Sequence, residues 1–168
     1  MELGRYPLDI RSFFDMFSSF PFLTTLQSAM DCIFCHIVQR SAPAELLFEN
    51  ETAIGILDRS PIHFGHALII PKDHCQTFLD VPAASLAGIM EATSLVTRAL
   101  VSTLQLQGFN IFCNNGKVAG QSVFHFHWHI TPRYANDNIR FELKLKQYPD
   151  GQMAEYAQRI REYIHSTV

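Results

Sequence analysis

The sequence has no excess of positive charge, and charged residues of either sign are scarce. Its 13 Lys and Arg are outnumbered by 16 Asp and Glu, and only 17% of its residues are charged. The basic residues do not gather in a stripe, so the electrostatic footprint of a protein that binds a long polyphosphate backbone is missing. These properties exclude a nucleic-acid scaffold and favour a small ligand.

Cysteine and long apolar runs are also scarce. The chain has four cysteines, and two of them, Cys75 and Cys113, stand alone in the sequence. A small secreted domain that depends on disulfides carries a denser framework of cysteines. No long apolar span predicts a membrane helix. We therefore expect a protein without a membrane segment, in a reducing, cytoplasmic compartment.

The remaining composition and patterning predict an α+β fold. The chain has 168 residues, of which 48% are hydrophobic, and this suits one globular domain with a buried core. Short apolar segments bounded by turn residues predict antiparallel strands. These strands are expected at residues 45–48, 52–57, 66–70, 109–113 and 123–130. Apolar residues at helical spacing run from Pro82 to Gly108, and a second stripe runs from Met153 to Ile164. We expect an antiparallel meander sheet with one long central helix and a C-terminal helix.

The first 29 residues do not have the pattern of a targeting segment. Acidic residues interrupt their apolar run, and Pro21 breaks it again, which argues against a transit peptide and against a secretory signal. Met30 directly precedes the first motif of the chain. We predict that residues 1–29 are an extension or an upstream mis-start and that residues 30–168 form a single domain.

Three histidines, His125, His127 and His129, alternate with bulky apolar residues. Side chains on a strand alternate between its two faces, so this spacing predicts three imidazoles on one face and apolar packing on the other. Each imidazole is a potential nucleophile, base or metal ligand at cellular pH. Two readings stay open at this point: nucleophilic catalysis, or a zinc hydrolase in which all three histidines are ligands.

A polar turn at residues 113–122 leads into the histidine segment. Gly116 and Gly120 allow backbone conformations that bring amides close to a ligand, while Asn114 and Ser122 offer side-chain donors. Lys117 adds a positive charge at the rim. The turn therefore suits an anion such as a phosphate. The alternative is a hairpin turn without a ligand.

The segment from Gly120 to Arg133, GQSVFHFHWHITPR, resembles the signature of the histidine-triad (HIT) family of nucleotide hydrolases and transferases. The likeness extends upstream through the segments DCIFCHIV at 31–38, ILDRSP at 56–61 and GHALIIPKDH at 65–74, so it covers about residues 31 to 135. The N-terminal Cys-x-x-Cys and the sequence of the glycine turn resemble the bacterial-type branch. This resemblance implies the HIT-like fold for residues 30–168.

The resemblance also implies a covalent two-step hydrolysis. His127 attacks the α-phosphorus of a nucleotide, and water then releases a nucleoside monophosphate. A hydrogen bond from the other ring nitrogen of His127 to a backbone carbonyl would fix the required tautomer. By family analogy His129 and Ser122 contact the phosphate, while Asn114 and Gln121 orient the phosphate or the leaving group. No catalytic metal is required for this chemistry.

The third triad position separates hydrolases from transferases. The nucleotidyltransferase branch of the family has glutamine where this chain has His129, so the resemblance favours a hydrolase. The matching positions for the nucleoside are Asp58 for the ribose hydroxyls, His66 beside the pocket, and three apolar residues around a purine base. These three are Ile33, Phe34 and Ile37. The alternatives are that the apolar three are core residues and that Asp58 is a turn residue.

Cys32 and Cys35 form a second constellation, because two thiolates at this spacing suit one tetrahedral metal when two further ligands arrive from elsewhere. The resemblance supplies those ligands, His74 and His125, and implies a structural Zn²⁺ site. A redox pair and two small core residues are the alternatives.

We therefore expect a hydrolase that acts on purine nucleotide conjugates such as nucleoside phosphoramidates, aminoacyl adenylates or diadenosine polyphosphates. The alternative from a different class is a nucleotide-binding or interaction module of the same fold without significant turnover. The expected partner is a small nucleotide rather than nucleic acid. The resemblance further implies a homodimer formed through the long helix and a sheet edge.

Overall fold

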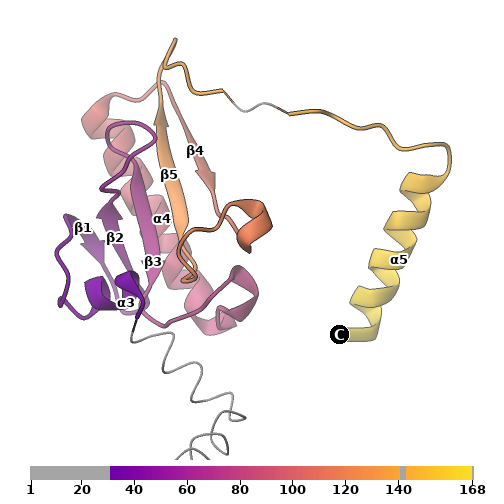
Figure 1. Ribbon diagram of the computed structural model, residues 1–168, viewed down its shortest axis with the longest axis horizontal. Coiled ribbons are helices and arrows are strands. Elements are labelled where there is room, and N and C mark those ends of the chain that lie inside the picture. The colour runs from indigo at the N-terminus through magenta and orange to yellow at the C-terminus, as the bar shows by residue number, and fades with distance from the viewer. Residues whose placement is uncertain (1–30, 141–142, 168) are drawn as a thin grey trace, which may run out of the picture. The chain divides into compact units, whose positions relative to one another are not determined.

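The computed structural model describes residues 31–140 and 143–167, which form a mixture of helices and antiparallel strands (Figure 1). The expectations for residues 1–29 lie outside the described residues. The chain separates into two compact units, the first ending at Asp137 and the second beginning at Asn138. The first unit holds all the predicted site residues.

The described part of the first unit contains a five-stranded antiparallel sheet in the order β1-β2-β3-β5-β4. The strands are β1 (Leu46–Glu49), β2 (Ala53–Leu57), β3 (Ala67–Pro71), β4 (Gly108–Phe112) and β5 (Trp128–Arg133). The first three strands form a meander. The last two form an antiparallel pair that joins the sheet through β5, so that β4 is an edge strand and β5 is internal.

Both faces of the sheet are covered, because strand residues alternate between two hydrophobic clusters. On β2 and β3, Ala53 and Ile69 pack with helix α4 (Ala83–Leu104), whereas Ile54 and Leu68 pack with the short helix α3 (Ile33–Val38). In Figure 1, α4 runs behind the sheet. The described residues of the first unit also contain two 3-10 turns, η1 (Phe78–Asp80) and η2 (Lys117–Ala119).

Helix α4 begins directly after Pro82, a residue that suits a helix start because it needs no amide partner. Ile89, Val96 and Leu100 are buried on one side, which fits the spacing of three and four residues that faces a helix toward a core. The helix ends at Leu104, before the expected Gly108, because Gln105 adopts a left-handed φ of 51° and terminates the helical hydrogen bonds.

Helix α4 is also long and apolar enough, by length and composition, to cross a membrane. The expectation that no such span exists was wrong on that criterion. The core helix of a globular unit passes the same test, and the buried residues of α4 pack on the sheet. The absence of a membrane segment stays a prediction.

The second unit contains helix α5 (Gln152–Thr167), which matches the predicted C-terminal helix and extends it by several residues. Met153, Tyr156 and Ile160 recur at spacings of three and four, which gives the helix one apolar stripe.

The histidine segment is less regular than predicted. Its strand was expected at residues 123–130, but β5 starts at Trp128, so that only His129 of the three histidines lies in the strand. The ladder with β3 ends at the Ile69–Trp128 pair although β3 runs to Pro71, and β4 ends at Phe112, opposite His129. The amide of Phe126 instead donates to the carbonyl of Cys75 over 2.6 Å. Phe126 still packs on the α4 side of the sheet, while His129 lies opposite Leu68 on the α3 side.

Candidate active site and metal centre

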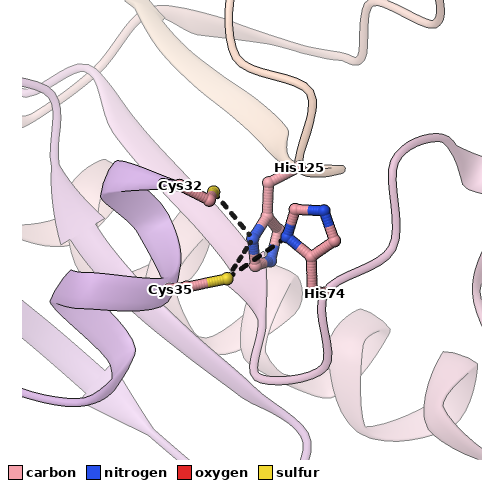
Figure 2. A group of neighbouring side chains, drawn as sticks. All are labelled: Cys32, Cys35, His74 and His125. Atoms are coloured by element: carbon pink, nitrogen blue, oxygen red, sulfur yellow. Dashed lines mark hydrogen bonds between the residues drawn. The ribbon is translucent and has the colours of Figure 1, made fainter. Parts of the chain in front are cut away.

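Cys32, Cys35, His74 and His125 come together at the edge of the first unit, as predicted (Figure 2). The thiols share one side of the first turn of α3, because residues three apart on a helix are neighbours. His125 Nδ1 lies 3.5 Å from both sulfur atoms, and His74 Nδ1 lies 3.2 Å from Cys35 Sγ. Four potential ligand atoms therefore converge from three separate segments.

The spacing of these atoms fits a tetrahedral zinc ion. With Zn–S near 2.3 Å and Zn–N near 2.0 Å, a tetrahedral ion places its sulfur and nitrogen ligands about 3.5 Å apart. The sulfur–nitrogen distances of 3.2 to 3.5 Å agree with that value. The second ring nitrogen of His125, Nε2, donates to the carbonyl oxygen of Pro71 over 2.9 Å, which fixes the ring with Nδ1 toward the thiols. These residues fit a structural zinc site.

The electrostatics of the cluster also suit a cation. Burial, together with the neighbouring Cys32, raises the pKa of the Cys35 thiol to about 12. Burial lowers the pKa of His125 to about 4, so the imidazole is neutral at pH 7. A bound metal ion reverses the balance for the thiols, because a coordinating thiol is deprotonated outright.

His127 lies beside this Cys–His cluster and is buried. Its Nδ1 donates to the carbonyl oxygen of His125 over 2.8 Å, which is the hydrogen bond expected from the sequence. The ring packs edge-on against Phe34, with ring centroids 5.0 Å apart. With its proton on Nδ1, the neutral imidazole carries a lone pair on Nε2. His127 therefore has the tautomer of a nucleophile.

His129 is tied to the two residues predicted for the ribose side of the pocket. Its Nδ1 lies 3.0 Å from His66 Nε2, and His66 Nδ1 lies 3.4 Å from Asp58 Oδ2. Burial, with the neighbouring His127 and His66, lowers the pKa of His129 to about 4, while Asp58 opposes the shift. His129 is therefore neutral at pH 7.

Phe112 was not among the predicted site residues. Strand pairing places it opposite His129, and the two rings are stacked with centroids 4.7 Å apart and planes 14° from parallel. A phenylalanine in a predicted strand does not indicate this contact, because the sequence of neither strand alone determines the register between β4 and β5.

Gln121 holds the glycine turn together. It is only 4% exposed; its Oε1 accepts from the amide of Gly116, and its Nε2 donates to the carbonyl oxygens of Gln76 and Val123. Since both ends of the amide are engaged with the backbone, Gln121 is placed to position the turn rather than to contact a phosphate directly.

The other two predicted residues of the turn are less constrained. Gly120 has a φ of +88°, a backbone conformation that favours glycine, and a Cβ added there would make only an ordinary contact with Asn114 Nδ2, at 3.8 Å. Ser122 is exposed and borders a cavity of about 330 Å³ together with Ile33 and Gln76. The structure therefore does not bring Ser122 into hydrogen-bond contact with the histidines within the described residues.

The residues predicted to contact the nucleoside divide into two groups. Phe34 and Ile37 lie on α3 and are buried in the hydrophobic cluster between this helix and the sheet. This placement agrees with the alternative that they are core residues. Ile33, in contrast, is 43% exposed. Asp58 lies in a turn and also faces His66. Its Oδ1 accepts from the amide of Ser60 over 2.8 Å, and its Oδ2 faces His66.

A second cavity, larger than the one beside Ser122, lies elsewhere in the first unit. It has a volume of about 460 Å³, is lined mainly by apolar side chains of α4 and the β1–β2 hairpin, and contains none of the predicted site residues. The convergence of titratable groups, rather than cavity size, marks the candidate active site.

Comparison with known proteins agrees with this geometry. The family model of the HIT domain matches residues 39–136, which is more than half of the chain. The chain belongs to the HIT family. Among curated HIT-like proteins it is 34% identical to the adenylylsulfatase HINT3 of Arabidopsis thaliana over 146 residues, which cover 85% of this chain and 73% of the relative.

Two solved structures support the HIT fold and the metal centre. A histidine triad nucleotide-binding protein from Candida albicans superposes with a TM-score of 0.75 at 26% identity, covering 82% of this chain and 100% of the other. A zinc-bound histidine triad family protein from Mycobacterium smegmatis superposes with a TM-score of 0.63 at 36% identity, covering 83% and 99%. The HIT fold, as predicted, is confirmed.

Proposed function

We propose that this HIT protein is a hydrolase that cleaves purine nucleotide conjugates at the α-phosphate and releases a nucleoside monophosphate. The observation that carries the proposal is the hydrogen bond from His127 Nδ1 to the carbonyl oxygen of His125, which leaves a lone pair on His127 Nε2. The relationship to an adenylylsulfatase supports an adenylyl group on the substrate. Adenosine phosphoramidates, aminoacyl adenylates and diadenosine polyphosphates belong to this class.

The proposed reaction has two displacements. In the first, the lone pair on His127 Nε2 forms a bond to the α-phosphorus, and the bond from phosphorus to the leaving group breaks with its electron pair going to the leaving group. In the second, a water oxygen attacks the same phosphorus, the phosphorus–nitrogen bond breaks, and the electron pair returns to His127 Nε2. The water proton leaves to solvent or to a neighbouring base. Dividing one hard displacement into two easier ones is the benefit of the covalent route.

The neighbouring groups have separate parts in this proposal. His129, in line with His66 and Asp58, faces the reacting phosphate, and fixed donors there stabilise charge that develops on phosphoryl oxygens. Asn114 and Ser122 are proposed to donate to the phosphate, and Gln121 to hold their turn. Asp58 is proposed to accept from the ribose hydroxyls, with Ile33, Phe34 and Ile37 on the side of the base.

We also propose that Cys32, Cys35, His74 and His125 hold a structural zinc ion. The donor set, its spacing and the zinc-bound relative support this assignment. His125 would then connect helix α3 to the segment that carries His127. The chemistry above passes through no metal ion, so zinc contributes rigidity to the catalytic segment.

A homodimer is the proposed assembly, formed through α4 and the free edge of the sheet. Strand β4 lies at that edge, and its Phe109 and Ile111 are more than 40% exposed, which supports an interface there. Sedimentation of the wild type and of Ile111→Glu at equal concentration tests this. A monomeric wild type would contradict the proposal.

The experiment that tests the function measures AMP release from an adenosine phosphoramidate and, in parallel, from diadenosine tetraphosphate. Wild type and His127→Ala are compared in the presence of excess chelator. We expect AMP from at least one compound with the wild type and none above background with the variant. Binding of a nucleotide without turnover would instead support the binding module, and turnover that survives in His127→Ala would move the nucleophile elsewhere.

A further inference from the structure

His66 lies at the centre of a directional hydrogen-bond chain. It is 2% exposed, its Nδ1 lies 3.2 Å from the backbone amide of Ile62, and its Nε2 lies 3.0 Å from His129 Nδ1. The direction of the first hydrogen bond is certain, because the backbone N–H of Ile62 can only donate. The donors and acceptors of the later hydrogen bonds follow from this one.

The proton positions follow one by one. Because the Ile62 amide donates to His66 Nδ1, that nitrogen carries a lone pair, and the single proton of a neutral imidazole lies on Nε2. His66 Nε2–H then donates to His129 Nδ1. His129 Nδ1 is therefore an acceptor as well, and the proton of neutral His129 lies on its Nε2.

Asp58 is the group that competes with this arrangement. Its Oδ2 lies 3.4 Å from His66 Nδ1 and would accept a proton from it, which would reverse the chain. The amide of Ile62 is closer, at 3.2 Å, and the other oxygen of Asp58 is held by the amide of Ser60. Burial also lowers the pKa of His66, which disfavours the doubly protonated ring that could satisfy the carboxylate and His129 together.

The same logic argues against reading Asp58, His66 and His129 as a second metal site, although their ligand atoms lie within 4.8 Å of one another. A metal between the two imidazoles needs a lone pair on His66 Nε2. A neutral His66 would then carry its proton on Nδ1, against the amide of Ile62.

We propose that His66 is a positioning residue that holds His129 in the Nε2–H tautomer, opposite to the Nδ1–H tautomer of His127. This rests on the function proposed above. The adjacent histidines then present one lone pair and one proton to the same phosphate. His127 Nε2 attacks, while His129 Nε2–H donates a hydrogen bond to a phosphoryl oxygen, and neither ring needs a charge. Phe112, stacked on His129, keeps that ring in the plane that His66 requires.

The direct test is the proton position itself, measured on the full-length, zinc-loaded wild type. Long-range ¹H–¹⁵N correlation spectra of the histidine rings at neutral pH distinguish the two tautomers. We expect Nε2–H at His66 and His129 and Nδ1–H at His127. A proton on Nδ1 of His129 would overturn the proposal. This measurement uses no substrate, so its result is independent of whether the proposed hydrolase activity exists.

Two variants of equal size test the consequence for catalysis. His66→Gln keeps a donor that can face His129 Nδ1, whereas His66→Glu replaces the donor with a carboxylate acceptor. The titratable groups that face His129 are residue 66, His127 and Asp58. A carboxylate against Nδ1 raises the pKa of His129 and, above that pKa, keeps the remaining proton on Nδ1. The donor on Nε2 is then lost.

We therefore expect the kcat of the wild type to be flat above neutral pH and that of His66→Gln to follow the same profile. For His66→Glu we expect kcat to fall by about 100-fold as the pH rises through the raised pKa of His129, the usual effect of losing one such donor. His63→Glu serves as the control and should keep the pH profile of the wild type, because the side chain of His63 lies on the same loop but takes no part in the hydrogen-bond chain from Ile62 to His129. Equal pH profiles for the Gln and Glu variants would overturn the proposal. An unfolded Glu variant would leave the tautomer spectrum of the wild type to decide.

Discussion

Phe112 lies nearly flat against His129, with the ring planes 14° from parallel and the centroids 4.7 Å apart. The two residues are cross-strand partners at the end of the β4–β5 ladder. An apolar ring on one face of an imidazole withholds water from it, so this contact contributes to the burial that lowers the pKa of His129 to about 4.

Phe112→Leu should therefore raise the pKa of His129 toward its usual value near 6.5, because the smaller side chain admits water. Loss of the ring pair should also cost about 0.5–1.5 kcal/mol of stability. Titration of the His129 ring by NMR and urea unfolding measure the two effects. Phe109→Leu, on the same strand, is the control and should leave the pKa of His129 unchanged. An unchanged pKa in Phe112→Leu would show that the stacked ring does not shield the imidazole.

Cys35→Ser should abolish zinc binding, since it removes a ligand that approaches both histidines of the cluster. We expect less than one zinc per chain by metal analysis and a lower Tm. Cys113→Ser, outside the cluster, should keep both values. Chelation of the wild type should likewise lower Tm before it lowers kcat at a temperature where the protein stays folded. A wild type that is purified without zinc and takes none up would contradict the structural-zinc assignment.

Stability should fall as the pH drops from about 6.5 to about 4. In this window the unfolded chain protonates His129, whose unfolded pKa is near 6.5, while the folded protein does not, because its pKa there is about 4. Urea unfolding of the wild type and His129→Gln at several pH values isolates this contribution, and the variant should lose less stability in the window. His165→Gln, on α5, should behave as the wild type. Identical pH dependence in wild type and His129→Gln would refute the shift.

Gln121→Leu should destabilise the glycine turn, because the amide of Gly116 and the carbonyls of Gln76 and Val123 lose their side-chain partner. A buried group left without its partner costs about 1–3 kcal/mol. Chemical unfolding and kcat should both be affected, whereas Gln76→Leu, which keeps its backbone carbonyl, should change neither. A variant with wild-type stability and greatly reduced kcat would instead place Gln121 in direct contact with the phosphate.

Much of the fold followed from local sequence patterns. Proline before α4 and the spacing of Ile89, Val96 and Leu100 predicted the long helix, and short apolar segments bounded by turn residues predicted β2 and β3. What failed was the start of the histidine strand. Periodicity of two persists through His125 and His127, but the ladder with β3 ends at the Ile69–Trp128 pair, and β4 ends at Phe112, opposite His129.

In the candidate site, too, some features could be predicted from the sequence and others depend on how the strands pair. The spacing of Cys32 and Cys35 and the family resemblance predicted the four cluster residues, and the chemistry of a neutral imidazole predicted that His127 Nδ1 donates to a backbone carbonyl, which is that of His125. The contact between His66 and His129 joins residues that are 63 positions apart, and it depends on how β3 and β5 pair. No local pattern contains that register, so the hydrogen-bond chain from Ile62 became visible only in the folded protein.

The central claim is that His127 becomes covalently nucleotidylated, and trapping that species tests it most directly. Wild type mixed with an adenosine phosphoramidate is quenched within the first turnover and analysed by intact mass and peptide mapping. We predict one adenylyl group per chain, located on His127, that forms and decays at rates consistent with kcat, and none in His127→Ala. Steady release of AMP by the wild type, with no adduct at any time and with undiminished turnover in His127→Ala, would contradict the account.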